Sequence, residues 1–217
     1  MKDLGLFTEE CLEAIRRATV EAEKRTSGEI VPYIVERVDD HDEARWRAST
    51  LGALLAALLA GGVHALGGFW GGAGVWWITL PALAGGGLGY FLAGFEGIGR
   101  RLIPSDHLDR RVQLRAGAAF LEEEVFKTRD RTGILIFLAL FERRAVVLAD
   151  EGIHRAVPQD QWQQVIDDLV AGIKARKAPE ALQKAIGRCG ELLALHKVDR
   201  RPDDEDELDN APRVKRR

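Results

Sequence analysis

The feature that most constrains this chain is a long run, Ala48 to Phe95, that contains no Asp, Glu, Lys or Arg. A bilayer core is about 30 Å thick and needs about 20 apolar residues in helical form to cross it. The run is long enough for two such helices and a tight turn. It therefore predicts a transmembrane helical hairpin over residues 48–96, inserted into an otherwise charged chain.

The composition of the run supports this interpretation. We expect spans at Ser49–Leu66 and Val75–Phe95, joined by the glycine-rich turn Gly67–Gly74. Gly85 and Gly89 form a small-xxx-small pair, which lets membrane helices approach closely. Aromatic residues stand near the span ends, as at membrane interfaces: Trp46, Trp70, Trp76, Trp77, Tyr90, Phe91 and Phe95. The alternative is a buried helix pair in a soluble protein, which a domain of this size would struggle to enclose.

Basic residues set the expected orientation. Arg45 and Arg47 precede the first span, Arg100 and Arg101 follow the second, and the turn between the spans is uncharged. The positive-inside rule places both ends of the hairpin, and hence the soluble domain, in the cytoplasm. The N-terminus lacks the apolar core of a signal peptide, so the internal hairpin is the predicted route to the membrane.

The flanking sequence predicts an α/β domain in two parts, residues 1–47 and 97–197. A helix begins after Thr8, with Ile15 and Ala22 on its apolar face. Strands are expected at Glu29–Val38, Gly133–Leu140 and Ala145–Ala149. Pro32 indicates an edge position or a bulge in the first strand. Further helices are expected at Ser105–Lys127, with Leu114, Ala118, Leu121 and Val125 inward, and after Pro158 and Pro179.

This order of elements predicts the topology. A crossover helix links the first two strands, so they should run parallel, and a short turn makes the third antiparallel. The predicted fold is an α/β/α sandwich with a small mixed sheet, interrupted by the two-helix transmembrane hairpin. Residues 198–217 are charged and nearly without apolar side chains, so we expect a disordered tail. A net charge of −3 without a basic stripe argues against nucleic acid as a partner.

Three segments together resemble the TPM domain family, named after a thylakoid lumen protein, a photosystem II repair protein and a nematode receptor modulator. They are TSGEIVPYIV, RTGILIFLALFERRAVVLADEGI and VPQDQWQQVIDDLVAGIKA. The resemblance covers about Leu6 to Leu195 and implies an α/β/α sandwich. Some members are acid phosphatases or bind calcium, and others are accessory factors of membrane protein complexes. The hairpin within the domain resembles a bacterial membrane-anchored subgroup, which implies a multi-pass protein of the inner cell membrane.

The expected topology brings polar residues to one end of the sheet. Glu29 begins the first strand, Thr132 precedes the second, and Asp150 follows the third. Their oxygen atoms are suited to a divalent cation such as calcium, and Asp150 is the acidic position that matches the family. The alternative is that Glu29 and Asp150 are strand-end and capping residues facing water. His154 is either a general acid/base or a surface residue after a turn.

The opposite end of the sheet is expected to face the membrane. Arg143 and Arg144 lie in the turn between the second and third strands, and with Arg100 and Arg101 they are candidates to meet lipid phosphates. An ion pair of Arg143 with Glu142 or with a nearby Asp is the alternative. The leading function is an accessory or scaffold factor for a membrane protein complex. A metal-dependent acid phosphatase and a calcium-binding module are the alternatives.

Overall fold

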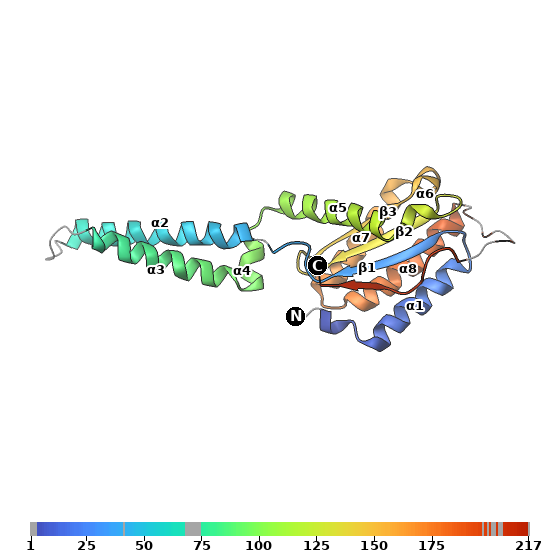
Figure 1. The fold of residues 1–217 in the computed structure, drawn as a ribbon, viewed down its shortest axis with the longest axis horizontal. Helices are drawn as coiled ribbons and strands as arrows, with labels where there is room; N and C mark the ends of the chain where they lie inside the picture. Colours follow the sequence, from blue (N-terminus) through green and yellow to red (C-terminus); the bar gives the residue numbers. More distant parts are fainter. Residues whose placement is uncertain are drawn as a thin grey trace. The chain divides into compact units, whose positions relative to one another are not determined.

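The computed structural model describes residues 4–40, 42–67, 75–196, 198, 200, 203 and 206–216. The chain forms two compact units. The first, here called the sheet unit, comprises Met1–Asp39 and Asp109–Arg217; the second, the helical unit, comprises Asp40–Leu108. Each unit is described by itself, with the elements labelled in Figure 1.

The sheet unit is built on four strands in the order β3-β2-β1-β4. β1 (Glu29–Val35) and β2 (Gly133–Ala139) pair in parallel, and β2 pairs with β3 (Arg144–Ala149) in antiparallel. The predicted relation of these three strands is confirmed, as is a mixed α/β fold with a small sheet. β1 and β2 are buried along their whole length, which explains their nearly unbroken apolar sequences.

The fourth strand corrects one prediction. β4 (Arg213–Lys215) pairs in parallel with β1, where the charged sequence had indicated a disordered tail over residues 198–217. Composition misled because the edge of β1 supplies the backbone partners that this polar segment lacks by itself. Val198, Leu208 and Val214, from the described part of residues 198–217, pack against the two hydrophobic clusters of the sheet unit.

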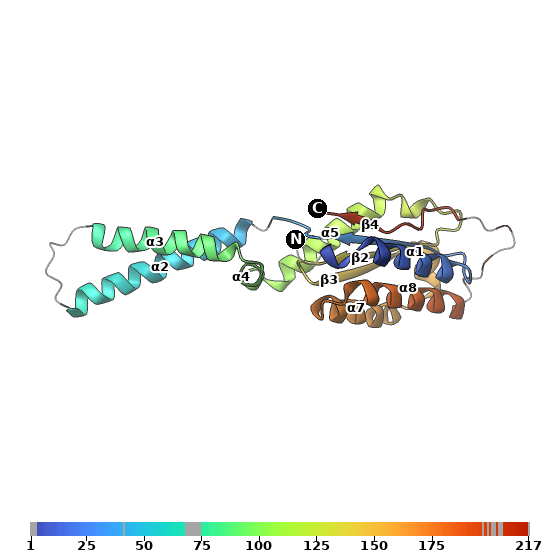
Figure 2. The ribbon, with the colours of Figure 1, turned by 90° about the horizontal axis from the view of Figure 1, so that it is seen from below.

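Helices cover both faces of the sheet (Figure 2). One face packs against α1 (Glu9–Glu23), α6 (Glu151–Ala156), α7 (Gln159–Lys174) and α8 (Ala178–Leu195). The other packs against α5 (Ser105–Glu122). Short 3-10 turns lie at Leu4–Leu6 and Val125–Lys127. Alternate residues of β1 and β2 point into the two clusters, so the sheet is the middle layer of three.

The orientation of α5 about its axis differs from the prediction. Val112, Ala116 and Ala119 face the sheet and are buried, whereas Leu114 and Leu121 are 66 % and 64 % exposed. The small alanines let the helix lie close to the sheet, so the bulkier leucines are on the outside. The helix also ends at Glu122 rather than near Lys127, because Glu124 takes a left-handed backbone conformation (φ 53°).

β1 lies between β2 and β4, so the predicted edge position is wrong for the strand as a whole, but Pro32 lies in the part of β1 that does not pair with β4. The N–H of Glu29 donates to the β2 side, to the carbonyl of Thr132, and that of Glu36 donates to the β4 side, to Lys215. Because successive backbone groups alternate between the two sides of a strand, the nitrogen of Pro32 faces the β4 side. β4 begins pairing only at Tyr33, so no ladder hydrogen bond is lost at Pro32.

The helical unit consists of α2 (Asp42–Gly67), α3 (Trp76–Ala93) and α4 (Glu96–Arg101). α2 and α3 are antiparallel, since Gly52 meets Gly85 while Ala48 meets Gly89. A Cβ added to Gly52, Gly85 or Gly89 would clash with the backbone of the facing helix, so glycine is what permits this separation. Residues 68–74 of the expected turn, including Trp70, lie outside the described residues.

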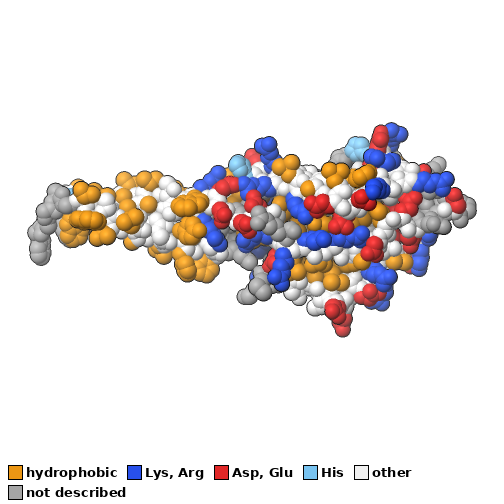
Figure 3. Space-filling model, in the orientation of Figure 1, with side chains coloured by type: hydrophobic (Ala, Val, Ile, Leu, Met, Phe, Trp, Pro, Cys, Tyr) orange, Lys and Arg blue, Asp and Glu red, His pale blue; other side chains and the backbone are white. Residues whose placement is uncertain are grey.

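The outer surface of α2 and α3 is apolar. Their large hydrophobic side chains are exposed, among them Leu58 at 73 %, Leu83 at 71 % and Trp76 at 69 %. Figure 3 shows hydrophobic side chains over this helix pair and charged ones over the visible face of the sheet unit. Among the described helices, α2 is the one long and apolar enough by itself to cross a membrane. α3 does not meet that criterion; tryptophan, proline and several glycines lower its hydropathy.

Candidate functional site

The end of the sheet at which β1 and β2 begin and β3 ends collects the three residues predicted to form a site. Glu29 is opposite Gly133 in the ladder, and its N–H donates to the carbonyl of Thr132 at 3.1 Å. The N–H of Asp150 donates to the carbonyl of Gly133 at 2.9 Å. The fold thus places Glu29, Thr132 and Asp150 at one end of the sheet, but their side chains contact different groups.

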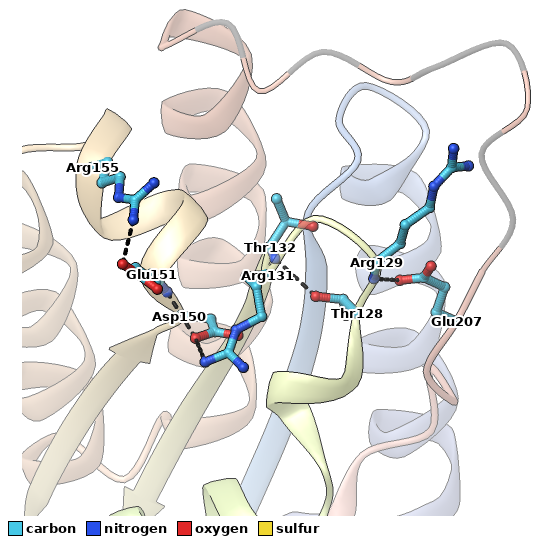
Figure 4. Close-up of polar contacts among 8 residues, drawn as sticks. All are labelled: Thr128, Arg129, Arg131, Thr132, Asp150, Glu151, Arg155 and Glu207. Atoms are coloured by element: carbon cyan, nitrogen blue, oxygen red, sulfur yellow. Dashed lines mark hydrogen bonds and ion pairs between the residues drawn. The ribbon is translucent and has the colours of Figure 1, made fainter.

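Asp150 is a helix cap and an ion-pair partner. Its side chain accepts from the N–H of Glu151 at 2.8 Å, at the start of α6. The Arg131 guanidinium meets both carboxylate oxygens, with Nη2 2.9 Å from Oδ1 and Nε 2.8 Å from Oδ2 (Figure 4). Arg131 is half-exposed and Asp150 is buried, so the cation covers the carboxylate from the solvent side.

The Thr132 hydroxyl joins two loops. It donates to the carbonyl of Ser27 at 2.8 Å, while the Thr132 N–H donates to the hydroxyl of Thr128 at 2.8 Å. These bonds fix the starts of β1 and β2 side by side. His154 lies one turn into α6, and its side chain is exposed.

Glu29 faces the C-terminal tail, here residues 206–216. Its side chain is buried at 4 % exposure, and its two oxygens accept from the N–H groups of Glu207 and Leu208 at 3.3 and 3.4 Å. Burial raises the pKa of Glu29 to about 7, while these two hydrogen bonds oppose the rise. Glu29 therefore anchors a segment more than 170 residues away along the chain.

A second buried carboxylate, Glu23, was missed by the sequence reasoning. It ends α1, is 5 % exposed, and accepts from the N–H of Ile30 at 2.7 Å. The Asn210 amide, oriented with its nitrogen toward the carboxylate, donates to it as well. Burial, together with the charge of Glu29, raises the pKa of Glu23 to about 8, while the hydrogen bond from the Ile30 N–H opposes the rise. The available signal was helical spacing, because Glu23 recurs with Ile15 and Thr19 on the buried face of α1.

Glu23 and Glu29 are here called the carboxylate pair. Because their pKa values are raised, both side chains can bind or release a proton near neutral pH. Both lie where a charged tail crosses the sheet end. Among the described residues, no three His, Cys, Asp or Glu side chains come close enough together to hold a metal ion. A cation at this end would need backbone or amide oxygens beside the two carboxylates.

The four arginines predicted to meet lipid belong to different units. Arg143 and Arg144 lie at the β2–β3 turn of the sheet unit, where Arg144 pairs with Asp109 and Arg143 takes a left-handed backbone conformation (φ 53°). Arg100 and Arg101 end α4 in the helical unit. Glu142, beside Arg143, is buried and accepts from the N–H of Val38 at 3.1 Å. A shared lipid-facing surface stays a prediction.

Comparison with known proteins now identifies the domain. The fold is similar to the NMR structure of the BA42 protein from the psychrophilic bacterium Bizionia argentinensis, with a TM-score of 0.58 and 20 % identity over 95 % of this chain and 94 % of that one. No curated protein sequence matches the chain. The sequence model of the TPM domain matches residues 104–192, from the start of α5 into α8. The resemblance to the TPM domain noted in the sequence is therefore confirmed for residues 104–192.

Proposed function

We propose that this TPM-domain protein is an integral membrane protein of the bacterial inner membrane, in which α2 and α3 form a two-helix transmembrane hairpin. The observation that carries this proposal is the exposure of large apolar side chains around both helices. Burying a side chain such as leucine or valine is worth about 1.5–3 kcal/mol. Soluble monomers rarely expose contiguous apolar patches larger than a few hundred Å². In a bilayer, lipid tails would cover these side chains, and the cost of exposing them to water would disappear.

The interior of the helix pair supports the same environment. Gly52 and Gly85 bring the backbones of α2 and α3 together, and Gly89 contacts the backbone of Ala48. Close packing of small residues is how helices associate in lipid, where the hydrophobic effect does not drive them together. The failure of α3 to qualify as a span by itself is compatible with a hairpin, because it is uncharged throughout and packs along α2.

We infer a cytoplasmic location for the sheet unit from the charges that flank the helices. Arg45 and Arg47 lie at the start of α2, and Arg100 and Arg101 lie in α4, after α3. The test is a pair of topology reporters fused after Arg217, one active only in the cytoplasm and one only outside it. Activity of the external reporter would overturn the orientation. Extraction of the protein from membranes by alkaline carbonate would overturn the hairpin itself.

Within this location, the proposed role is an accessory or scaffold factor for a membrane protein complex. The support is the connectivity of the chain, since both ends of the helical unit continue into the sheet unit, and a membrane hairpin would therefore tether the sheet unit by two covalent connections. The polar groups at the sheet end mostly bind the protein itself. In-cell crosslinking followed by purification in mild detergent is expected to recover a defined membrane protein. Recovery of the chain alone would count against this role.

The carboxylate pair favours a second candidate, a metal-dependent phosphatase or a calcium-binding module. Two buried carboxylates with raised pKa values would each lose their proton more readily beside a cation. Glu29, Thr132 and Asp150 remain the proposed ligands. Purified protein is expected to hydrolyse a generic phosphoester, or to melt at higher temperature in calcium, if this candidate is right. Neither effect across a range of cations and pH values would exclude it.

A further inference from the structure

The edge of β1 that faces away from β2 is covered along only part of its length. β1 spans Glu29–Val35, whereas β4 pairs only with Tyr33–Val35 and bonds to the N–H of Glu36. The even-numbered residues of β1 direct their backbone groups toward this edge, as the bonds of Glu29 and Glu36 to opposite neighbours establish. An uncovered strand edge is a template for pairing with another chain.

In the first half of the edge, where no described residue forms a strand beside β1, two local features block strand pairing. The N–H of Ile30 donates to the Glu23 carboxylate, and Pro32 has no N–H to offer. Both devices prevent a foreign strand from pairing there. The second half, from Tyr33 to Glu36, has no such protection in its own residues, and it is the part that the C-terminal tail covers.

The tail is held there mainly by polar contacts. Arg213 Nε lies 2.9 Å from a carboxylate oxygen of Glu123, in a pair whose side chains are only 15 % and 19 % exposed. Glu29 accepts two tail N–H groups, and none of the three residues of β4 is fully buried. A short strand with few buried apolar contacts opens at lower free-energy cost than the buried core strands.

We propose that the β1 edge from Tyr33 to Glu36 is a peptide-docking site and that the tail occupies it as an internal ligand. The partner is an extended segment of another protein that runs parallel to β1 and carries an arginine at the position of Arg213. The tail defines this chemistry: backbone pairing accepts any extended segment, and the partly buried Glu123 carboxylate selects a guanidinium for it. An apolar residue follows, at the position of Val214.

The inference rests on the proposed accessory role for its physiological partner, but its chemistry is testable without one. A tethered tail acts at an effective concentration on the order of millimolar, so a partner must displace it. The probe is a synthetic peptide of the sequence ELDNAPRVKRR, residues 207–217. It is added at several millimolar to the isotope-labelled full chain, and hydrogen exchange is followed at the chain's own Arg213 and Lys215 amides, whose backbone groups face β1.

We expect exchange at these two amides to accelerate by about tenfold as the peptide displaces the tail, while the amides of β2 keep their protection. The same peptide with Arg213→Glu is expected to have no effect. Unchanged exchange with the unaltered peptide, or equal acceleration by both peptides, would overturn the proposal. These outcomes do not depend on membrane insertion or on the capture of a complex.

A second measurement uses a full chain that carries Arg213→Glu and Lys215→Pro, which removes the ion pair and one ladder donor from its own tail. This chain is expected to bind the labelled peptide at least about tenfold more tightly than the unaltered chain does. Arg216→Glu, just beyond β4, is the matched control and should bind as weakly as the unaltered chain. If two unaltered chains instead exchange tails and dimerise, the occupant is a second copy and the proposed partner is wrong. Should the double variant fail to fold, the exchange measurement decides.

Discussion

The helical unit and the sheet unit place the same kinds of residue on opposite sides. In the helical unit, glycine and alanine form the inner contact between α2 and α3, and leucines such as Leu58 lie outside. In the sheet unit, Leu138 and its neighbours are fully buried, and charged side chains lie outside. Helix periodicity alone therefore does not say which side of an element is the interior. The surrounding solvent decides, and under the proposed membrane hairpin the two units have different solvents.

The largest effect should come from removing a leucine in each unit. Leu138→Ala leaves a cavity in the fully buried core of the sheet and is expected to lower the free energy of unfolding by about 2–5 kcal/mol. Leu58→Ala removes a side chain that is 73 % exposed and should change it by less than about 0.5 kcal/mol in detergent. Denaturant unfolding of both variants measures the difference. A comparable loss in Leu58→Ala would mean that α2 packs against protein rather than lipid.

Gly85 and Gly87 lie on the same helix, α3, but only Gly85 is in close contact with α2. Gly85→Leu forces a side chain into the backbone of Gly52 and the methyl group of Ala56, so we expect a loss of about 1–3 kcal/mol from overpacking. Gly87 lies on the same helix with open space around its Cα, and Gly87→Leu is the matched control. Thermal unfolding in lipid nanodiscs separates the two. Equal melting temperatures would show that α2 and α3 are not held by close contact.

The sequence predicted the parts of this fold in which pattern and environment agree. The nearly unbroken apolar run from Gly133 to Ala139 is a strand buried on both faces. It could be recognised because a short run of apolar residues is typical of such a strand. The common end of β1, β2 and β3 followed from the crossover helix, which makes β1 and β2 parallel, and from the short turn, which makes β3 antiparallel. Glu29, Thr132 and Asp150 were therefore brought to one end of the sheet correctly.

The rest depended on contacts between distant segments. β4 is charged and short, and only the free edge of β1 makes it a strand. The face of α5 was misjudged because Ala116 and Ala119 are weaker apolar signals than Leu114 and Leu121, although they fit closer to the sheet. The sequence pattern also did not predict the partners of the site residues, which are Arg131 for Asp150 and the tail for Glu29. Periodicity locates elements, but it does not identify what a polar side chain will meet.

The carboxylate pair predicts a pH dependence that is confined to the sheet unit. Because the pKa of Glu23 is raised to about 8 in the folded protein, folding takes up a proton there. This contribution to stability is fully present below the unfolded pKa near 4.5 and is lost as the pH rises through about 8. Glu23→Gln has no charge to bury and keeps an acceptor for the Ile30 N–H. It should be more stable than the unaltered chain by about 1–2 kcal/mol at pH 9, and equal to it near pH 5.

The measurement is the denaturation midpoint of each protein at several pH values between 5 and 9. Glu21→Gln, two residues earlier on α1 and largely exposed, is the control and should follow the unaltered chain. If Glu23→Gln loses stability at every pH, the ionised carboxylate is needed for its hydrogen bonds, and its burial is not the dominant cost. The run from Ala48 to Phe95 should contribute no such trend, because it contains no Asp, Glu, Lys or Arg.

The smallest effect is expected at Asp150, where a structural and a ligand-binding role predict different results. Asparagine caps helices about as well as aspartate, so Asp150→Asn keeps the bond to the Glu151 N–H and loses only the ion pair with half-exposed Arg131. The expected loss is about 0.5–1 kcal/mol. Arg131→Gln, which removes the same ion pair from its other side, should cost a similar amount.

A calcium-dependent rise in melting temperature, if present, separates the roles: it disappears in Asp150→Asn if the carboxylate binds the cation. It persists or increases in Arg131→Gln, because that variant frees the carboxylate from its competing cation. Equal responses in both variants would leave Asp150 as a cap alone and move any cation to the carboxylate pair.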